Sequence, residues 1–247
     1  MAERVQVEAF LQQLLQPQAF KDYGPNGLQV EGVAEVRSLA SGVTASLAFI
    51  DAAIAAGADT LLVHHGLFWR GQDGRLTGWL AARVRRLMAA GVNLFAYHLP
   101  LDAHAELGNN AQLGQRLGLV ADGRFGEQAL GFIGPAVQPL QGLLASLRTQ
   151  LGREPLLLPG DGRPLRRVAW CSGGAQGYFE DAIAAGADAF LTGEVSEPQA
   201  HLAHETGVAF IACGHHATER FGAPAVAAHL AAHFGLAHRF IDLDNPA

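Results

Sequence analysis

Short apolar runs alternate with amphipathic stretches along most of the chain. Runs of this kind occur from Leu39 to Val43, from Thr60 to Val63 and from Val92 to Tyr97. Apolar runs bounded by turn residues are typical of strands that are buried on both faces of a parallel sheet. Residues 75–90 instead carry apolar side chains every three or four positions and end at a glycine, which predicts a helix. This order of elements predicts an α/β fold.

The same pattern occurs twice. Residues 53–59 read Ala-Ile-Ala-Ala-Gly-Ala-Asp, and the identical heptapeptide recurs at 182–188. Equivalent apolar runs flank both copies, and a Gly-Val pair opens a further run in each copy, at 91–92 and 207–208. We therefore predict one βαβαβ unit used twice.

The repeat also suggests how the chain is divided. We predict a first α/β half at residues 1–120, a small intervening subdomain at 121–165 and a second half at 166–247, because glycine and proline interrupt the middle stretch. Ligands of parallel α/β sheets bind beyond the carboxyl ends of the strands. Two pseudo-repeated three-layer halves are therefore expected to enclose one cleft.

Composition and charge narrow the possible functions. The net charge is −6 at pH 7 and the sequence pI is about 6.0, which argues against a nucleic-acid surface because phosphate binding needs clustered Lys and Arg. No apolar stretch approaches the roughly 18 residues that a membrane span requires. Cys171 and Cys213 form no paired framework, and this suits a reducing, cytoplasmic location.

Histidines and acids follow the apolar runs of the first copy. His64 and His65 come directly after one run, and His98 follows the next. Asp102 stands four residues after His98. A single histidine at a strand end is more often a satisfied polar residue than a ligand, so these residues are interpreted jointly with the histidine and acid that end strands in the second copy.

The second copy has chemically similar residues in the corresponding places. Glu194 follows one strand and His215 the next, with Glu219 four residues after His215. Glu194 could be a hydrogen-bond partner of a metal ligand, a general acid–base group or a solvated loop acid. Because both copies end their strands in such residues, we expect the two sets to converge on one cleft.

Imidazole nitrogen and carboxylate oxygen are ligands for divalent transition metals. The candidate ligands are His64, His65, His98, Asp102, His215 and Glu219. This set is too large for one ion and suits two, about 3.5 to 4 Å apart and bridged by a carboxylate. Adjacent histidines in an extended strand point to opposite sides, so unless the strand has already ended, His64 and His65 are expected to serve different ions.

The motifs together resemble the Nif-three-like family of dinuclear metal-centre proteins, whose members are often described as GTP cyclohydrolase I type 2 homologues. The segments that carry the resemblance are 64–69, 98–110, 191–194 and 214–219. The resemblance implies two ions of iron, zinc or manganese and a toroidal homohexamer built as a trimer of dimers. The ligands that it implies are His64, His65, Asp102, His215 and Glu219, with His98 nearby or also liganding.

The leading functional hypothesis is a metal-dependent hydrolase that acts on a small molecule such as a nucleotide. With GTP as the substrate, activated water would attack C8 of guanine and ring opening would release formate. His98 or Glu194 would carry the proton. A metal-handling hexameric scaffold and a two-metal phosphoesterase are the alternatives; the phosphoesterase lacks support from a Gly-rich phosphate loop before a lysine.

Overall fold

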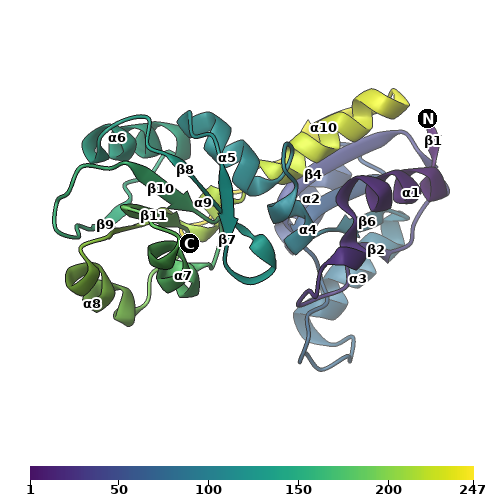
Figure 1. Cartoon of the computed structure of the whole chain (residues 1–247). Helices are drawn as coiled ribbons and strands as arrows, with labels where there is room; N and C mark the ends of the chain where they lie inside the picture. The colour runs from purple at the N-terminus through teal and green to yellow at the C-terminus, as the bar shows by residue number, and fades with distance from the viewer. The chain divides into compact units, whose positions relative to one another are not determined.

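The computed structural model describes all 247 residues, and the chain forms two compact units. The first unit comprises residues 1–108 and 222–244, and the second comprises 109–221 and 245–247. Each unit contains one large sheet with a core of parallel strands, and Figure 1 labels many of the helices and strands.

The large sheet of the first unit has the strand order β13-β4-β5-β6-β2. Its strands are β2 (Gly27–Val30), β4 (Ser38–Thr44), β5 (Thr60–His65), β6 (Asn93–Ala96) and β13 (Ala237–Phe240). β13, β4, β5 and β6 run parallel, and β2 pairs antiparallel with β6. The short strands β1 (Ala2–Glu3) and β3 (Glu35–Val36) pair separately.

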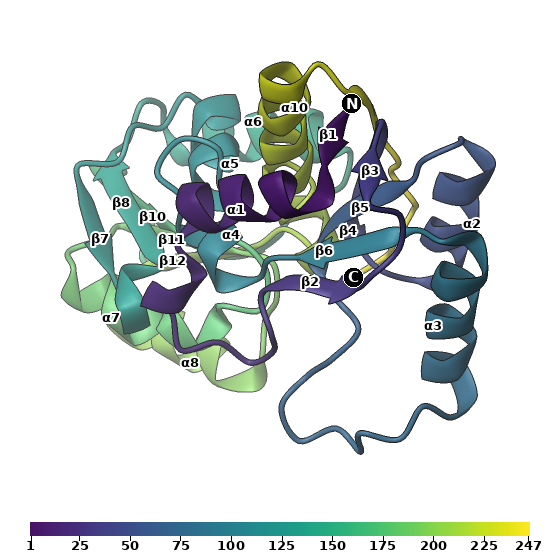
Figure 2. The ribbon, with the colours of Figure 1, turned by 90° about the vertical axis from the view of Figure 1, so that its right-hand side faces the viewer.

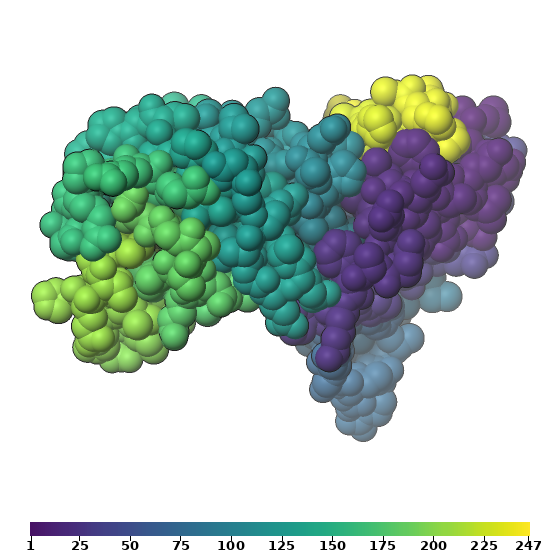
Figure 3. Space-filling view, viewed as in Figure 1, coloured from purple at the N-terminus to yellow at the C-terminus, as the bar shows by residue number.

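Helices cover both faces of this sheet. They are α1 (Arg4–Leu15), α2 (Leu47–Ala55), α3 (Gly78–Ala90) and α10 (Gly222–Phe234), with α4 (Leu99–Ala103) and the 3₁₀ turn η1 (Pro17–Ala19) beside them. Leu61 and Val63 of β5 belong to a hydrophobic cluster that includes buried residues of α2 and α3. Leu62 belongs to a second hydrophobic cluster, which includes buried residues of α1 and α10. Figure 2 shows these pairs of helices on opposite sides of the sheet, and Figure 3 shows α10 beside the N-terminal segment.

The second unit has a six-stranded sheet in the order β7-β8-β10-β11-β12-β9. Its strands are β7 (Gly123–Phe125), β8 (Gly131–Pro135), β9 (Leu156–Leu158), β10 (Arg167–Trp170), β11 (Ala189–Thr192) and β12 (Ala209–Ala212). β10, β11 and β12 run parallel, and the other three strands pair antiparallel at the two edges.

Helices again lie on both faces. The remaining elements are α5 (Asn109–Leu117), α6 (Leu140–Leu151), α7 (Phe179–Ala184), α8 (Glu197–Thr206), α9 (His215–Thr218), η2 (Glu127–Ala129) and η3 (Gln176–Tyr178). α5 and α6 pack around Trp170 and Leu191. On the opposite face, the rings of Phe179, Phe190 and Phe210 meet at centroid distances between 5.0 and 6.1 Å.

The predicted α/β class and its duplicated βαβαβ unit are confirmed. The copies are β4-α2-β5-α3-β6 and β10-α7-β11-α8-β12, each with helices on both faces of its sheet. The predicted helix at 75–90 begins three residues late, at Gly78. No helix combines the length and apolar character needed to cross a bilayer.

The division into units follows contacts that the repeat does not reveal. The stretch predicted as a separate subdomain, 121–165, contributes β7, β8 and β9 to the sheet of the second unit, because β8 pairs with β10 and β9 with β12. The C-terminal elements α10 and β13 return to the first unit, where β13 pairs with β4.

Replacing Leu62 with alanine tests the double-sided core. Leu62 is 1% exposed, so the truncation should leave a cavity and lower the free energy of unfolding by about 2 to 5 kcal/mol. Chemical denaturation followed by circular dichroism measures this loss. The matched control, Val5→Ala, removes a side chain that is 63% exposed and should change stability by less than about 0.5 kcal/mol; equal losses in both variants would contradict the assigned core.

Candidate metal centre

In the first unit, the candidate ligands lie where two neighbouring parallel strands end. His64 and His65 are the last residues of β5, and His98 follows β6. A short helix then begins, with Pro100 in its first turn, a position that proline favours because its ring already has a helical φ. The turn brings Asp102 back toward His98, whose carbonyl accepts a hydrogen bond from the Asp102 N–H at 3.2 Å.

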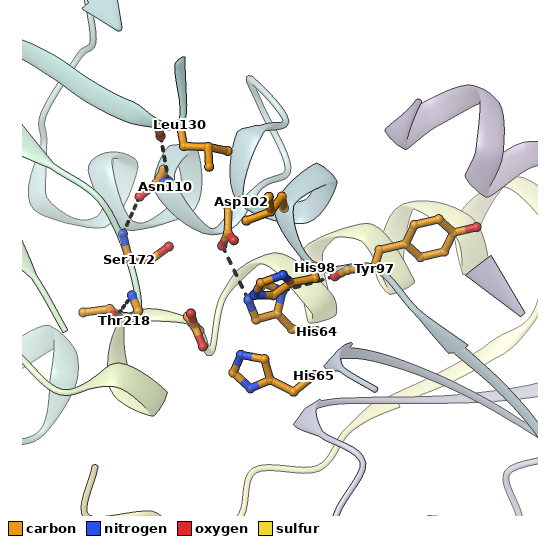
Figure 4. A network of polar contacts seen from close by, with 12 residues as sticks. His64, His65, Tyr97, His98, Asp102, Asn110, Leu130, Ser172 and Thr218 are labelled. Carbon is orange, nitrogen blue, oxygen red and sulfur yellow. Dashed lines mark hydrogen bonds and ion pairs between the residues drawn. The ribbon is translucent and has the colours of Figure 1, made fainter. Parts of the chain in front are cut away.

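The three imidazole rings of this unit form one cluster. Ring centroids are 4.5 Å apart for His64 and His65, 4.9 Å for His64 and His98, and 5.7 Å for His65 and His98. One nitrogen from each ring lies within 4.8 Å of the other two. Asp102 Oδ1 lies 3.6 Å from His64 Nε2, and both residues are buried. Figure 4 shows these rings side by side, with Asp102 joined to His64.

The expectation that His64 and His65 point to opposite sides does not hold for their rings. His65 is the last residue of β5, where the strand gives way to a loop. Its Nδ1 lies 3.0 Å from Thr44 Oγ1, on the paired strand β4. Because the extended strand ends at His65, its side chain can turn toward His64, and the alternation of a regular strand no longer applies.

A hydrogen bond fixes the orientation of the His64 ring. Its Nδ1 lies 3.1 Å from the carbonyl oxygen of Tyr97. A carbonyl oxygen only accepts, so Nδ1 carries the proton and Nε2 carries the lone pair. The nitrogen that faces Asp102 is therefore the one able to bind a cation.

Asp22 is a site residue that the sequence analysis missed. Its Oδ1 lies 2.7 Å from His98 Nδ1, and its Oδ2 accepts hydrogen bonds from Asn26 Nδ2 and from the backbone N–H of Leu99. Burial opposes ionisation, but the hydrogen bonds from His98 and Asn26 and the charge of His98 outweigh it and lower the pKa of Asp22 to about 2. The only sequence signal was an acid next to a Gly-Pro-Asn-Gly turn, which is common in loops.

In the second unit, His215 lies between two carboxylates. Its Nδ1 is 2.6 Å from Glu194 Oε1, and its Nε2 is 3.2 Å from Glu219 Oε2. Glu219 is buried, whereas the Glu194 side chain is 44% exposed and also accepts a hydrogen bond from Gln176 Nε2 at 3.1 Å. His215 thus contacts both of the other predicted residues, Glu194 and Glu219.

A left-handed glycine makes room for this group. Gly173 has φ +70°, and a Cβ at this position would lie 2.0 Å from Glu219 Oε1. Its N–H donates to Thr218 Oγ1 at 2.9 Å, and its carbonyl accepts from Thr192 Oγ1 at 3.1 Å. These bonds hold the backbone beside the carboxylate, and Figure 4 shows Thr218 in this network.

The two carboxylates favour a charged imidazole. The hydrogen bond to Glu219, together with the charge of Glu219 and the hydrogen bond and charge of Glu194, outweighs burial and raises the pKa of His215 to about 9. A cation that binds at Nε2 takes the place of this proton, since a ligating imidazole must be neutral.

Both units therefore offer the same combination of donors, an imidazole Nε2 facing a buried carboxylate oxygen. Nitrogen and oxygen donors of this kind suit zinc, iron and manganese. The fold and these side chains define a class of duplicated α/β proteins with histidine–carboxylate groups at the ends of their parallel strands.

Sequence comparison shows which family this is. The sequence model of Duf34/NIF3 (NGG1p interacting factor 3) matches residues 2–246, and the chain belongs to this family. A Pseudomonas aeruginosa protein called "GTP cyclohydrolase 1 type 2 homolog" is 50% identical over 232 residues, which is 92% of each chain. An Escherichia coli K12 protein of the same name is 46% identical, covering 99% of this chain and 100% of its own.

Solved structures agree with this assignment. The structural-genomics protein ybgI, described as of unknown function, superposes with a TM-score of 0.95 at 43% identity over 100% of both chains. TTHA1606 from Thermus thermophilus superposes with a TM-score of 0.92 at 37% identity, again over the full length of both chains. The predicted family resemblance is confirmed.

The low pKa of Asp22 predicts a pH-dependent contribution to stability. A carboxyl group whose pKa falls from 3.8 to about 2 on folding stabilises the folded state by about 2 kcal/mol above pH 4, and this contribution is lost as the pH falls through 2. The stability difference between the wild type and Asp22→Asn should therefore shrink by about 1 kcal/mol between pH 6 and pH 3. Urea unfolding at several pH values measures it, and a difference independent of pH would contradict the assignment.

Proposed function

We propose that this protein is a hydrolase that depends on two divalent metal ions. The proposed ligands are His64, His65, Asp102, His215 and Glu219. The ions would be iron, zinc or manganese, all of which accept imidazole and carboxylate donors.

One observation carries the proposal: in each unit, hydrogen bonding leaves Nε2 as the nitrogen turned toward a buried carboxylate. Tyr97 engages Nδ1 of His64, whose Nε2 faces Asp102. In the second unit, Glu194 engages Nδ1 of His215. Metal-binding histidines characteristically donate their other ring N–H to a carbonyl or carboxylate, which fixes the tautomer and the ring orientation. A buried histidine that served only packing would need no such repeated arrangement.

When bound, a pair of divalent ions would lower the pKa of a coordinated water and polarise the electrophilic carbon of the substrate. His98 is proposed to carry protons, because a carboxylate supports its Nδ1 and one nitrogen of its ring lies within 4.8 Å of nitrogens of His64 and His65. Glu194 is the second proposed proton carrier, since its carboxylate both contacts His215 and reaches solvent. Both residues would move protons to and from the reacting groups.

The proposed substrate is a nucleotide, with GTP as the first compound to test, because several relatives are named as GTP cyclohydrolase homologues. The proposed reaction is hydrolytic opening of the five-membered ring of guanine, in which C8 leaves as formate. The acidic net charge and the absence of a basic cluster at the candidate centre favour a small-molecule substrate over a nucleic acid.

The proposed assembly is a toroidal homohexamer, a trimer of dimers, and the proposed location is the cytoplasm. The family resemblance supports the hexamer. Cys171 and Cys213 are both buried thiols with no disulfide, which supports a reducing compartment. Light scattering of the purified protein would give the mass of the assembly directly.

Asp102→Ala tests the hydrolase proposal. Removing this buried carboxylate should lower metal affinity and should reduce formate release from GTP by at least about 100-fold. The loss should be this large because the variant lacks a metal ligand itself, and not merely the hydrogen-bond partner of a ligand. Elemental analysis and separate formate and phosphate assays of the purified protein provide the measurements.

The matched control is Asp51→Ala, which removes an exposed carboxylate paired with Arg86 on the surface. It should keep both metal and turnover. Undiminished hydrolysis by metal-depleted Asp102→Ala would refute the proposal. Full metal loading of the wild type without turnover of any nucleotide would also refute it and would favour metal handling, whereas phosphate release alone would point to a phosphoesterase.

A further inference from the structure

We propose that Asp22 is a positioning residue that sets the ring orientation and the tautomer of His98, so that the unprotonated Nε2 faces the histidine cluster. The role of this arrangement in turnover rests on the proposed function. The tautomer itself follows from contacts within the first unit and can be tested whether or not the protein is a hydrolase.

The carboxylate of Asp22 contacts the imidazole ring of His98 directly. Asp22 Oδ1 lies 2.7 Å from His98 Nδ1, and the Asp22 side chain is only 4% exposed. A short, buried contact of this kind is a charge-assisted hydrogen bond, which is stronger and more directional than a neutral one. It therefore defines the plane of the imidazole ring.

The other groups that form hydrogen bonds with this carboxylate are donors. Oδ2 accepts from the Leu99 N–H at 2.9 Å and from Asn26 Nδ2 at 2.8 Å, while the Tyr23 N–H lies 2.6 Å from Oδ1. An ionised carboxylate accepts on both oxygens and donates on neither. The proton in the contact with His98 must then be on Nδ1, so a neutral His98 ring carries its lone pair on Nε2.

The same loop also holds the backbone of His98. The His98 N–H donates to Asn26 Oδ1 at 2.7 Å, so residues 22–26 fix both the main chain and the ring. The ring of Trp69 stands perpendicular to the His98 ring at a centroid distance of 5.1 Å. Rotation of the imidazole is thereby opposed by packing as well as by hydrogen bonding.

These constraints give His98 a defined chemical task. One nitrogen of the ring lies within 4.8 Å of nitrogens of His64 and His65. With the proton held on Nδ1 by Asp22, Nε2 is available to accept a proton from a group in this cluster. Asp22 acts through His98 and is not itself expected to contact the substrate.

Asp22→Asn tests the inference because an amide cannot accept on both sides. The amide NH₂ is expected in the place of Oδ1, and the amide oxygen in the place of Oδ2. The N–H of the buried Leu99 then keeps its acceptor. Tyr23 is 52% exposed, so its N–H can form a hydrogen bond with water instead. The amide then donates to His98 Nδ1, and the ring proton moves to Nε2. A change from Asp to Asn beside a histidine is known to reverse the tautomer in the serine-protease triad.

Solid-state ¹⁵N NMR of the full-length protein with ring-labelled histidine reads the tautomer directly. His98→Gln identifies the His98 signals by their loss, and both metal-free and zinc-loaded samples are measured. We expect Nδ1–H at His98 in the wild type and Nε2–H in Asp22→Asn. A wild-type His98 protonated at Nε2, or an unchanged Nδ1–H in Asp22→Asn, would overturn the inference.

Asn26→Ala is the matched structural control. It removes two hydrogen bonds from the same loop, those to Asp22 Oδ2 and from the His98 N–H, but leaves the contact between Asp22 and Nδ1. Its thermal stability should fall while His98 keeps its Nδ1–H. Reversal of the tautomer in this variant would mean that loop order in general, and not Asp22, sets it.

Steady-state kinetics of Asp22→Asn tests whether the tautomer of His98 affects turnover. Asp22→Asn should lower kcat by about 10- to 100-fold while KM and metal content stay at wild-type values. A reversed tautomer with unchanged kcat would overturn the assigned role in turnover. If the wild type hydrolyses no nucleotide, the proposed function fails, and the NMR result still decides whether Asp22 positions His98.

Discussion

Hydrogen bonds at Nδ1 determine which ring nitrogen of each histidine in the candidate centre is available for binding. The partners differ in chemistry: a backbone carbonyl for His64, a hydroxyl for His65, and carboxylates for His98 and His215. In each case Nε2 is the ring nitrogen left available to bind a cation or exchange a proton, because the hydrogen bond occupies Nδ1. At His215, the two carboxylates also raise the pKa of the imidazole to about 9.

The duplicated fold explains why such partners are in place. Each parallel core is buried on both faces, so its strands are almost wholly apolar and polar side chains appear mainly where the strands end. His64 and His65 end β5 and His98 follows the adjacent strand β6, so the three histidines lie at the same edge of one sheet. In the second copy, Glu194 and His215 follow β11 and β12 in the same way, and they touch.

Much of this arrangement could be predicted from the sequence, and the exceptions have physical reasons. The exact recurrence of residues 53–59 indicated the duplicated unit, and the histidines after apolar runs indicated the candidate ligands. The assignment of β8 and β9 to the second sheet depends on long-range pairing that no local pattern encodes. Asp22 was missed because its partner, His98, is 76 residues away and only tertiary structure brings them together.

The most direct test is a crystal structure of the zinc-saturated protein with anomalous data at the zinc edge. We expect two ions for each chain, bound through Nε2 of the ligating histidines and through carboxylate oxygens of Asp102 and Glu219. Ions bound through Nδ1 of these histidines, or no ion at any of these residues in zinc-saturated crystals, would contradict this expectation.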